Sequence, residues 1–103
     1  MFDYEADENT LKIFLSGEID HHRATAVRTC TDELIERFAP KKTILDFGKV
    51  TFCDSSGIAI VLSRYKKMQQ FGGTVELCNL PKQAETIFRL ANIEKLVKII
   101  QEA

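Results

Sequence analysis

The sequence predicts a single α/β domain with a small mixed β-sheet of about four to five strands and helices packed mainly on one side of it. Runs rich in β-branched residues alternate along the chain with amphipathic stretches, which is typical of crossover units in a partly parallel sheet. Two such runs precede the first helical stretch, so an antiparallel hairpin makes the sheet mixed. The 103 residues contain no repeat or linker, and 45% are hydrophobic and 28% charged, which favours one globular domain over residues 1–103.

A hairpin and a helix are expected in the first third of the chain. Apolar and polar residues alternate over 10–17, which predicts a strand, and residues 2–5 supply an edge strand that pairs with it through a turn at 7–9. Apolar residues then recur at helical spacing. Asp20 is a suitable N-cap for this helix, and Pro40 marks its end.

A strand and a second helix are expected in the middle of the chain. Residues 43–47 form a short β-rich run that Gly48 breaks, and 50–53 leads into a polar turn. A helix is expected over 56–70, because its apolar residues recur at helical spacing and a glycine pair at 72–73 ends it.

The last third of the chain predicts another strand, a third helix and a final strand. Residues alternate in polarity over 74–78 as in a strand. Pro81 suits the first turn of a helix, and Asn92 is a candidate for its C-terminal cap. Residues 97–100 form a last short strand.

The composition excludes several classes of protein. The formal net charge of −1 argues against a nucleic-acid binder with a basic stripe and against a polybasic membrane-surface protein. No apolar run approaches the length that spans a bilayer, and the acidic N-terminus does not resemble a signal peptide. The three cysteines, Cys30, Cys53 and Cys78, form no C-x-x-C pair. We therefore expect reduced thiols in a cytoplasmic protein.

Two polar segments, 18–22 and 53–57, follow predicted strands. Sites in such sheets gather at the loops that leave the carboxyl ends of strands. Cys53 is placed like the nucleophile of a cysteine phosphatase, but that chemistry needs an Arg six residues later to clamp the phosphate. The residue there is Ala59. The pattern therefore favours a small, buried structural role for Cys53.

Hydrolase and metal chemistry are also disfavoured. A nucleophile elbow at Ser55 would need a Gly two residues earlier and a catalytic His later in the chain, whereas the only histidines, His21 and His22, come before it. Adjacent histidines on a helix point about 100° apart, and no metal-ligand spacing is present. There is also no phosphate-binding glycine motif. We expect no catalytic residue, no metal and no cofactor.

The segment Asp54-Ser55-Ser56 has the composition of a helix N-cap. One Ser or Asp oxygen is enough to accept a free helix N–H, which leaves a second Ser at the mouth of the helix without a structural role. A phosphate there would lie near the positive end of the helix, which favours an anion. A Ser of this pair is therefore a physically sensible phosphoacceptor.

The apolar residues of the second helix define its expected core face. With Ile58 at the centre of that face, Ile60 falls on the polar side with Arg64 and Lys67. We therefore expect Ile60 to be exposed, as part of a partner-docking surface or as a lone surface apolar residue, and the basic run around Arg64 to be solvated.

Two motifs in this order are recognisable. Residues 17–22 read GEIDHH and residues 52–58 read FCDSSGI, and Arg64-Tyr65-Lys66 and the glycine pair follow in register. The chain resembles the anti-sigma factor antagonists of the STAS domain family, and the GEIDHH segment is similar to the sporulation type. The resemblance covers nearly the whole chain and implies a STAS-type fold.

The resemblance implies a non-enzymatic switch. Family members bind an anti-sigma factor that is also a serine kinase, and this frees the sigma factor to activate transcription. The kinase then phosphorylates a Ser of the D-S-S-G turn, which ends the interaction, and a serine phosphatase restores the active form. Carried over by position, the phosphoacceptor is Ser55 and Ser56 is the helix cap. Gly57 matches a glycine that lets a partner approach the turn. The expected partner-binding residues are Asp20, His21, Asp54, Ser56, Gly57 and Ile60.

Two features depart from the family pattern, and alternatives remain open. The chain stops at Ala103, where the sporulation type continues into a further helix, and Ile58 to Val61 is bulkier than the Gly-containing versions. One alternative is a general-stress or other signalling antagonist that acts on a different sigma factor. The other is a STAS scaffold or ligand-binding module without phosphorylation. No coiled-coil seam demands a dimer, so we expect a monomer.

Overall fold

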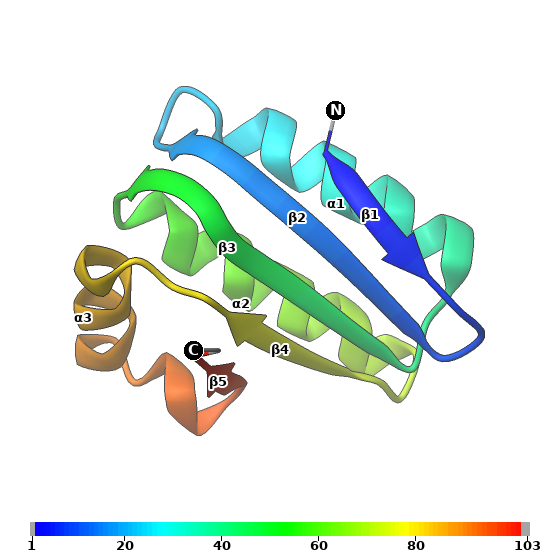
Figure 1. Ribbon diagram of the computed structural model, residues 1–103. Helices are drawn as coiled ribbons and strands as arrows, with labels where there is room; N and C mark the ends of the chain where they lie inside the picture. Colours follow the sequence, from blue (N-terminus) through cyan, green and yellow to red (C-terminus); the bar gives the residue numbers. More distant parts are fainter. Residues whose placement is uncertain (1, 102–103) are drawn as a thin grey trace.

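The computed structural model of the protein describes residues 2–101. Five strands form one sheet in the order β1-β2-β3-β4-β5, in which β1 runs antiparallel to β2 and the other neighbours are parallel (Figure 1). This topology confirms the predicted mixed sheet and the crossover units. The elements in chain order are β1 (Asp3–Ala6), β2 (Thr10–Ile19), α1 (Ala24–Phe38), β3 (Lys42–Cys53), α2 (Ser56–Gln70), β4 (Thr74–Cys78), α3 (Lys82–Leu90), a 3₁₀ turn η1 (Ile93–Lys95) and β5 (Lys98–Ile100).

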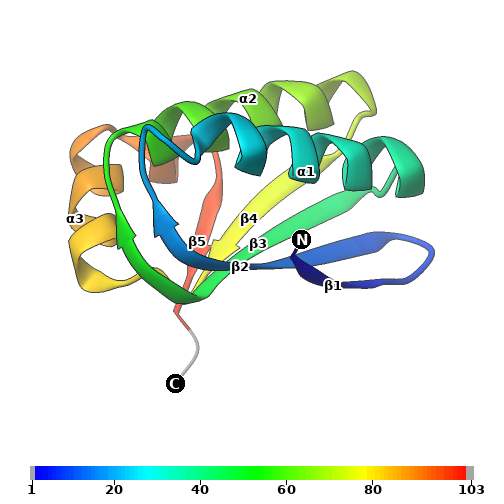
Figure 2. The same cartoon turned by 90° about the horizontal axis from the view of Figure 1, so that it is seen from above.

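The helices lie mainly on one side of the sheet, as predicted. Helices α1 and α2 run side by side over one face, and α3 lies at the end of the sheet near the carboxyl end of β3 (Figure 2). The core fills the space between the sheet and these helices. Its largest fully buried side chains come mainly from β2, β3 and the three helices, with one each from β4 and η1, and they include Leu11, Ile13, Phe47, Ile35, Met68 and Phe88.

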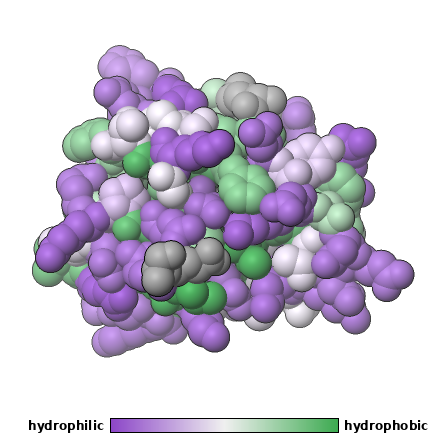
Figure 3. All heavy atoms as spheres, in the orientation of Figure 1, coloured by the Kyte–Doolittle hydropathy of each residue, from purple (hydrophilic) through white to green (hydrophobic). Residues whose placement is uncertain are grey.

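Among the described residues, no helix covers the other face of the sheet. Hydrophilic side chains predominate on this face, with scattered apolar ones between them (Figure 3). Lys12 pairs with Asp46 at 3.6 Å, and Lys42 pairs with Glu76 at 3.1 Å. Ion pairs between neighbouring strands are typical of the solvent-exposed face of such a sheet.

The hairpin turn forms where the sequence predicts it. The Asp7 carboxylate accepts hydrogen bonds from the backbone N–H groups of Asn9 and Thr10, each at 2.8 Å. These two bonds favour the ionised carboxylate and lower the pKa of Asp7. The short polar side chain thus closes the turn between β1 and β2.

The prediction that Gly48 breaks the third strand is wrong, because β3 continues through it to Cys53. The pairing of β3 with β2 shifts by one residue in this region and again just after Val50. Such bulges insert an extra residue into one strand and bend it without ending the ladder. The Asp46 carboxylate stabilises the first irregularity by accepting the Gly48 N–H at 2.8 Å.

Helix α1 begins later than predicted. Asp20 does not form its N-cap, because residues 21–23 form a turn before the helix starts at Ala24. The Asp20 carboxylate accepts the N–H of Arg23 at 3.0 Å and thereby organises this turn. At the other end, the helix stops at Phe38, before Pro40, as predicted.

Candidate functional site

The two polar segments lie beside each other at the carboxyl ends of β2 and β3. Ile19 is the register partner of Cys53, and the Asp54 N–H donates to the Ile19 carbonyl oxygen at 3.1 Å. The loops that begin at Asp20 and at Asp54 therefore leave the same edge of the sheet. This arrangement confirms the predicted juxtaposition of residues 18–22 and 53–57.

Asp54 caps helix α2. Its carboxylate accepts the Ser56 N–H at 2.8 Å, and its carbonyl oxygen accepts the Gly57 N–H at 3.0 Å. Ser56 is the first helical residue and acts here as a backbone donor. The expectation that Ser56 is the cap is therefore wrong, because the carboxylate two residues earlier already takes that role.

Ser55 occupies the N-cap position of α2, yet its side chain makes no capping hydrogen bond. It is exposed, and within residues 2–101 its hydroxyl group has no hydrogen-bond partner. Its carbonyl oxygen accepts the Ile58 N–H at 3.1 Å. The positive end of α2 would favour a phosphate on Ser55. The N–H groups of Ser56, Gly57 and Ile58, however, already have acceptors, so the phosphate oxygens would remain directed to solvent or to a partner.

Gly57 is buried, which contradicts the expectation that it leaves room for a partner. A Cβ atom at this position would overlap the Cys53 sulfur and would lie 3.3 Å from the Phe88 ring. The absence of a side chain therefore allows α2 to pack closely on the end of β3 and on α3.

Cys53 is buried, as its sequence context predicts. Burial is the main cause that raises the pKa of its thiol to about 11, and the neighbouring Asp54 charge adds to the effect. A thiol with a raised pKa stays protonated at neutral pH and is a poor nucleophile. The Gln83 side-chain amide forms two hydrogen bonds with the backbone of Cys53. Its NH₂ group donates to the Cys53 carbonyl oxygen at 2.8 Å, and its oxygen accepts the Cys53 N–H at 3.3 Å.

Arg23 holds the neighbouring loop in place. Its guanidinium donates to the carbonyl oxygens of Ser16 at 3.1 Å and Glu18 at 2.7 Å. It also lies against Gly17, whose φ of +78° and close contact with the guanidinium leave no room for a Cβ atom. This role of Arg23 is not predictable from the sequence, because an Arg carries no local signal for hydrogen bonds to carbonyl groups five and seven residues earlier. His21 and His22 are both exposed on this loop.

The prediction that Ile60 is exposed is wrong, since only 2% of its surface reaches solvent. Helix α2 buries Gly57, Ile60, Val61, Arg64 and Met68. The face is rotated relative to the prediction because α2 packs against α1 as well as against the sheet. The residues expected to be central, such as Ile58 and Leu62, are only half-buried.

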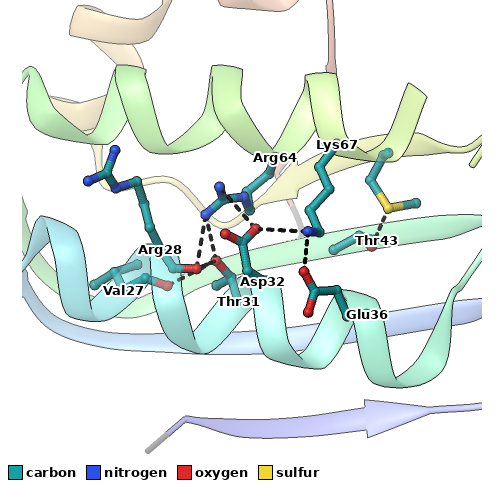
Figure 4. A network of polar contacts seen from close by, with 9 residues as sticks. Val27, Arg28, Thr31, Asp32, Glu36, Thr43, Arg64 and Lys67 are labelled. Atoms are coloured by element: carbon teal, nitrogen blue, oxygen red, sulfur yellow. Dashed lines mark hydrogen bonds and ion pairs between the residues drawn. The ribbon is translucent and has the colours of Figure 1, made fainter. Parts of the chain in front are cut away.

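Arg64 is also buried, at 4% exposed, and it joins α2 to α1 (Figure 4). Its guanidinium lies 3.0 Å from the Asp32 carboxylate and donates to the Thr31 hydroxyl at 3.0 Å and to the Arg28 carbonyl oxygen at 3.1 Å. Burial lowers the pKa of Arg64, whereas the charge of Asp32 opposes that change. One helical turn further on, Lys67 pairs with Glu36 at 2.6 Å. The expectation of a solvated basic run is thus wrong for Arg64.

The remaining site chemistry is sparse. In the part of the chain that the structure describes, no group of three or more His, Cys, Asp or Glu side chains could hold a metal ion. No helix among residues 2–101 is long and apolar enough to cross a membrane.

A pocket of about 230 Å³ lies between α1 and α2 and is lined by residues that include His21 and Ser56.

The comparisons with known proteins agree with this architecture. The family model of the STAS domain matches residues 1–102. The chain belongs to the STAS domain family. Within that family, its relatives include the anti-sigma F factor antagonist of Paenibacillus polymyxa, which is 33% identical over 95 residues, covering 92% of this chain and 81% of the relative. The anti-sigma-B factor antagonist of Bacillus subtilis is 26% identical over 94% of this chain and 87% of its own length.

Solved structures show the same fold. The anti-sigma factor antagonist SpoIIAA in its unphosphorylated form matches with a TM-score of 0.81 at 27% identity, over 96% of this chain and 87% of that chain. The Bacillus cell fate determinant SpoIIAA in its phosphorylated form matches with a TM-score of 0.72 at 27% identity, over 96% of this chain and 90% of that chain. The expected STAS-type fold and the resemblance to the sporulation type are both confirmed.

Proposed function

We propose that this protein is an anti-sigma factor antagonist whose switch residue is Ser55. In its unphosphorylated form it binds an anti-sigma factor that is also a serine kinase and thereby releases the sigma factor to activate transcription. Phosphorylation of Ser55 ends the interaction, and a serine phosphatase restores the binding form. The protein itself acts as a binding partner rather than as an enzyme, in the cytoplasm, as a monomer and without direct contact with nucleic acid.

The single observation that carries this proposal is the free hydroxyl group of Ser55. The side chain is exposed at the N-terminus of α2, and its neighbours Asp54 and Gly57 already have structural roles. Asp54 caps α2, and Gly57 packs against the core. A kinase can therefore modify Ser55 without breaking a hydrogen bond that the fold needs.

The surface around Ser55 is suited to a switch based on charge. Asp20 and Asp54 begin the two neighbouring loops and place carboxylates at the same edge of the sheet. A phosphate adds about −1.5 to −2 charges at neutral pH. In an interface fitted to the neutral hydroxyl, this charge would be desolvated and would face like charges, and every 1.4 kcal/mol lost weakens binding about tenfold.

We divide the expected partner-binding residues into two groups. Asp20, His21, Asp54 and Ser56 lie at or near the surface, and we assign them to direct contact with the partner. Gly57 and Ile60 are buried, so we assign them to support of this surface from beneath.

Replacement of Ser55 tests the proposal. We expect Ser55→Asp to bind the anti-sigma factor at least about tenfold more weakly than the wild type, because it places a permanent charge in the contact. Asn at this position has nearly the same shape as Asp but no charge, so the affinity of Ser55→Asn should lie within a few-fold of that of the wild type. Ser55→Ala should bind and resist inactivation by ATP. Titration calorimetry, with circular dichroism as the check on folding, measures these differences.

Equal affinity of Ser55→Asp and Ser55→Asn would contradict the charge-based switch. Anti-sigma factors of the sigma F and sigma B kinds, the two named by the relatives, are the partners to assay. Failure of the wild-type protein to bind either kind would contradict the proposed function itself.

A further inference from the structure

A pocket of about 230 Å³ opens between the N-terminal halves of α1 and α2, beside the Ser55 turn. Helix α1 contributes Thr25 and Arg28, and α2 contributes Ser56, Ala59 and the edge of Ile60, while His21 borders the pocket from the preceding turn. Four of the lining residues, Ala24, Thr25, Ser56 and Ala59, have small side chains. Further along, Arg64 with Asp32 and Lys67 with Glu36 close the gap.

Arg28 is the charged group of this pocket, and its guanidinium has no acidic partner among residues 2–101. Its carbonyl oxygen accepts a hydrogen bond from Arg64, whereas its side chain points away from that network (Figure 4). Two other arginines have partners within the fold: Arg23 donates to backbone carbonyl groups, and Arg64 forms an ion pair with Asp32. No acidic side chain lines the pocket.

The location of the pocket connects it to the proposed switch. Ser56, which directly follows the phosphoacceptor, lines it, so a partner that covers Ser55 also reaches the pocket mouth. The pocket lining contains further polar groups besides the Arg28 guanidinium, namely the hydroxyl groups of Thr25 and Ser56 and the imidazole of His21. An Arg fork matches the two oxygens of a carboxylate, and a pocket of this size accommodates one side chain.

We propose that this pocket receives the carboxylate of an Asp or Glu side chain of the anti-sigma factor, with Arg28 as its ion-pair partner. The inference rests on the proposed function, because it names the partner chemistry at the same surface. The occupant is a protein carboxylate rather than a nucleotide phosphate of the kinase. The Ser55 hydroxyl must face the nucleotide, and Ser55 does not line the pocket. In the complex, the pocket therefore faces the surface of the kinase around its nucleotide and not the nucleotide itself.

Charge reversal at Arg28 tests this proposal. We expect Arg28→Glu to weaken binding of the anti-sigma factor about tenfold to a hundredfold, as the loss of a charged interface pair does. Arg28→Lys keeps the charge but not the fork and should lose less. The matched control is Arg37→Glu, which makes the same change of net charge nine residues further along α1 and on the opposite side of the helix. It should bind within about threefold of the wild type.

The fold should tolerate the Arg28 variants, because the network uses only the backbone carbonyl group of this residue. Thermal unfolding monitored by circular dichroism checks that point. Ala59→Trp is a second, uncharged variant that fills the pocket and should also weaken binding. In the partner, an Asp or Glu changed to Lys should restore binding to Arg28→Glu, which identifies the occupant.

The outcomes separate the two claims. If the wild-type protein binds and Arg28→Glu binds equally well, the assignment of Arg28 as ion-pair partner is wrong while the proposed function stands, whatever the effect of Ala59→Trp. If the Arg28→Glu defect appears with ATP and disappears with ADP, the occupant is a nucleotide phosphate, which overturns the assignment to a protein carboxylate. If the wild type binds no anti-sigma factor, both claims fail.

Discussion

Each residue of the Asp54–Gly57 turn has a different physical role. The Asp54 carboxylate caps α2, the Ser56 N–H is the donor to that cap, and Gly57 lets the helix approach the core. Neither the Ser55 nor the Ser56 hydroxyl group has a hydrogen-bond partner within residues 2–101, but Ser55 is exposed, whereas Ser56 is half-buried beside the pocket between α1 and α2. A regulatory modification at this position therefore leaves the structural contacts of its neighbours in place.

Gly57 provides a test of this division at the residue scale. We expect Gly57→Ala to lower the free energy of unfolding by about 1–3 kcal/mol, because the new Cβ atom overlaps the Cys53 sulfur and presses on Phe88. In a Cys53→Ala background the sulfur is absent, and the same change should cost at least about 1 kcal/mol less. Urea denaturation of the four proteins of this cycle measures the coupling. Additive effects would show that the contact does not limit the packing.

The helix pair α1 and α2 supports the site at the scale of elements. Both helices follow neighbouring parallel strands, so their N-termini meet beside the Ser55 turn. The Arg64 guanidinium contacts three groups of α1, namely Arg28, Thr31 and Asp32. This set of bonds fixes how the two helices lie against each other, and hence the shape of the pocket between them.

Removal of this link should destabilise the protein. We expect Arg64→Met to lower the free energy of unfolding by about 2–3 kcal/mol, near the low end for a broken buried pair, because Asp32 is about one third exposed and can be rehydrated. The further change Asp32→Asn in that background should recover part of the loss. As a control, Lys66→Met alters an exposed residue of the same helix and should change stability by less than about 0.5 kcal/mol. An equally small effect at Arg64 would contradict its role.

The element scale also shows what the sequence could predict. Strand alternation and helical spacing are local properties, so the element order and the meeting of the two polar segments were predictable. Burial of Ile60 and Arg64 was not, since it depends on α1 lying beside α2. The ion-pair partner of Arg64 is more than thirty residues away in the chain. The path of β3 through Gly48 likewise depends on pairing with β2.

At the scale of the whole molecule, the packed sheet and helices support a small exposed turn that carries Ser55. One face of the sheet packs on the helices, and the core extends from β2 across to α3. The unphosphorylated and phosphorylated forms of SpoIIAA both match this fold, with TM-scores of 0.81 and 0.72. We therefore expect phosphorylation of this protein to act through the charge at its surface, with the fold retained.

Mapping of the phosphorylated residue decides whether Ser55 is the switch residue. The protein is incubated with ATP and the anti-sigma factor kinase from the same cell, and phosphopeptides are mapped by mass spectrometry. We expect one phosphate on Ser55, present in Ser56→Ala and absent in Ser55→Ala. A phosphate on Ser56, or none at all with a kinase that modifies a known substrate, would show that Ser55 is not the switch residue.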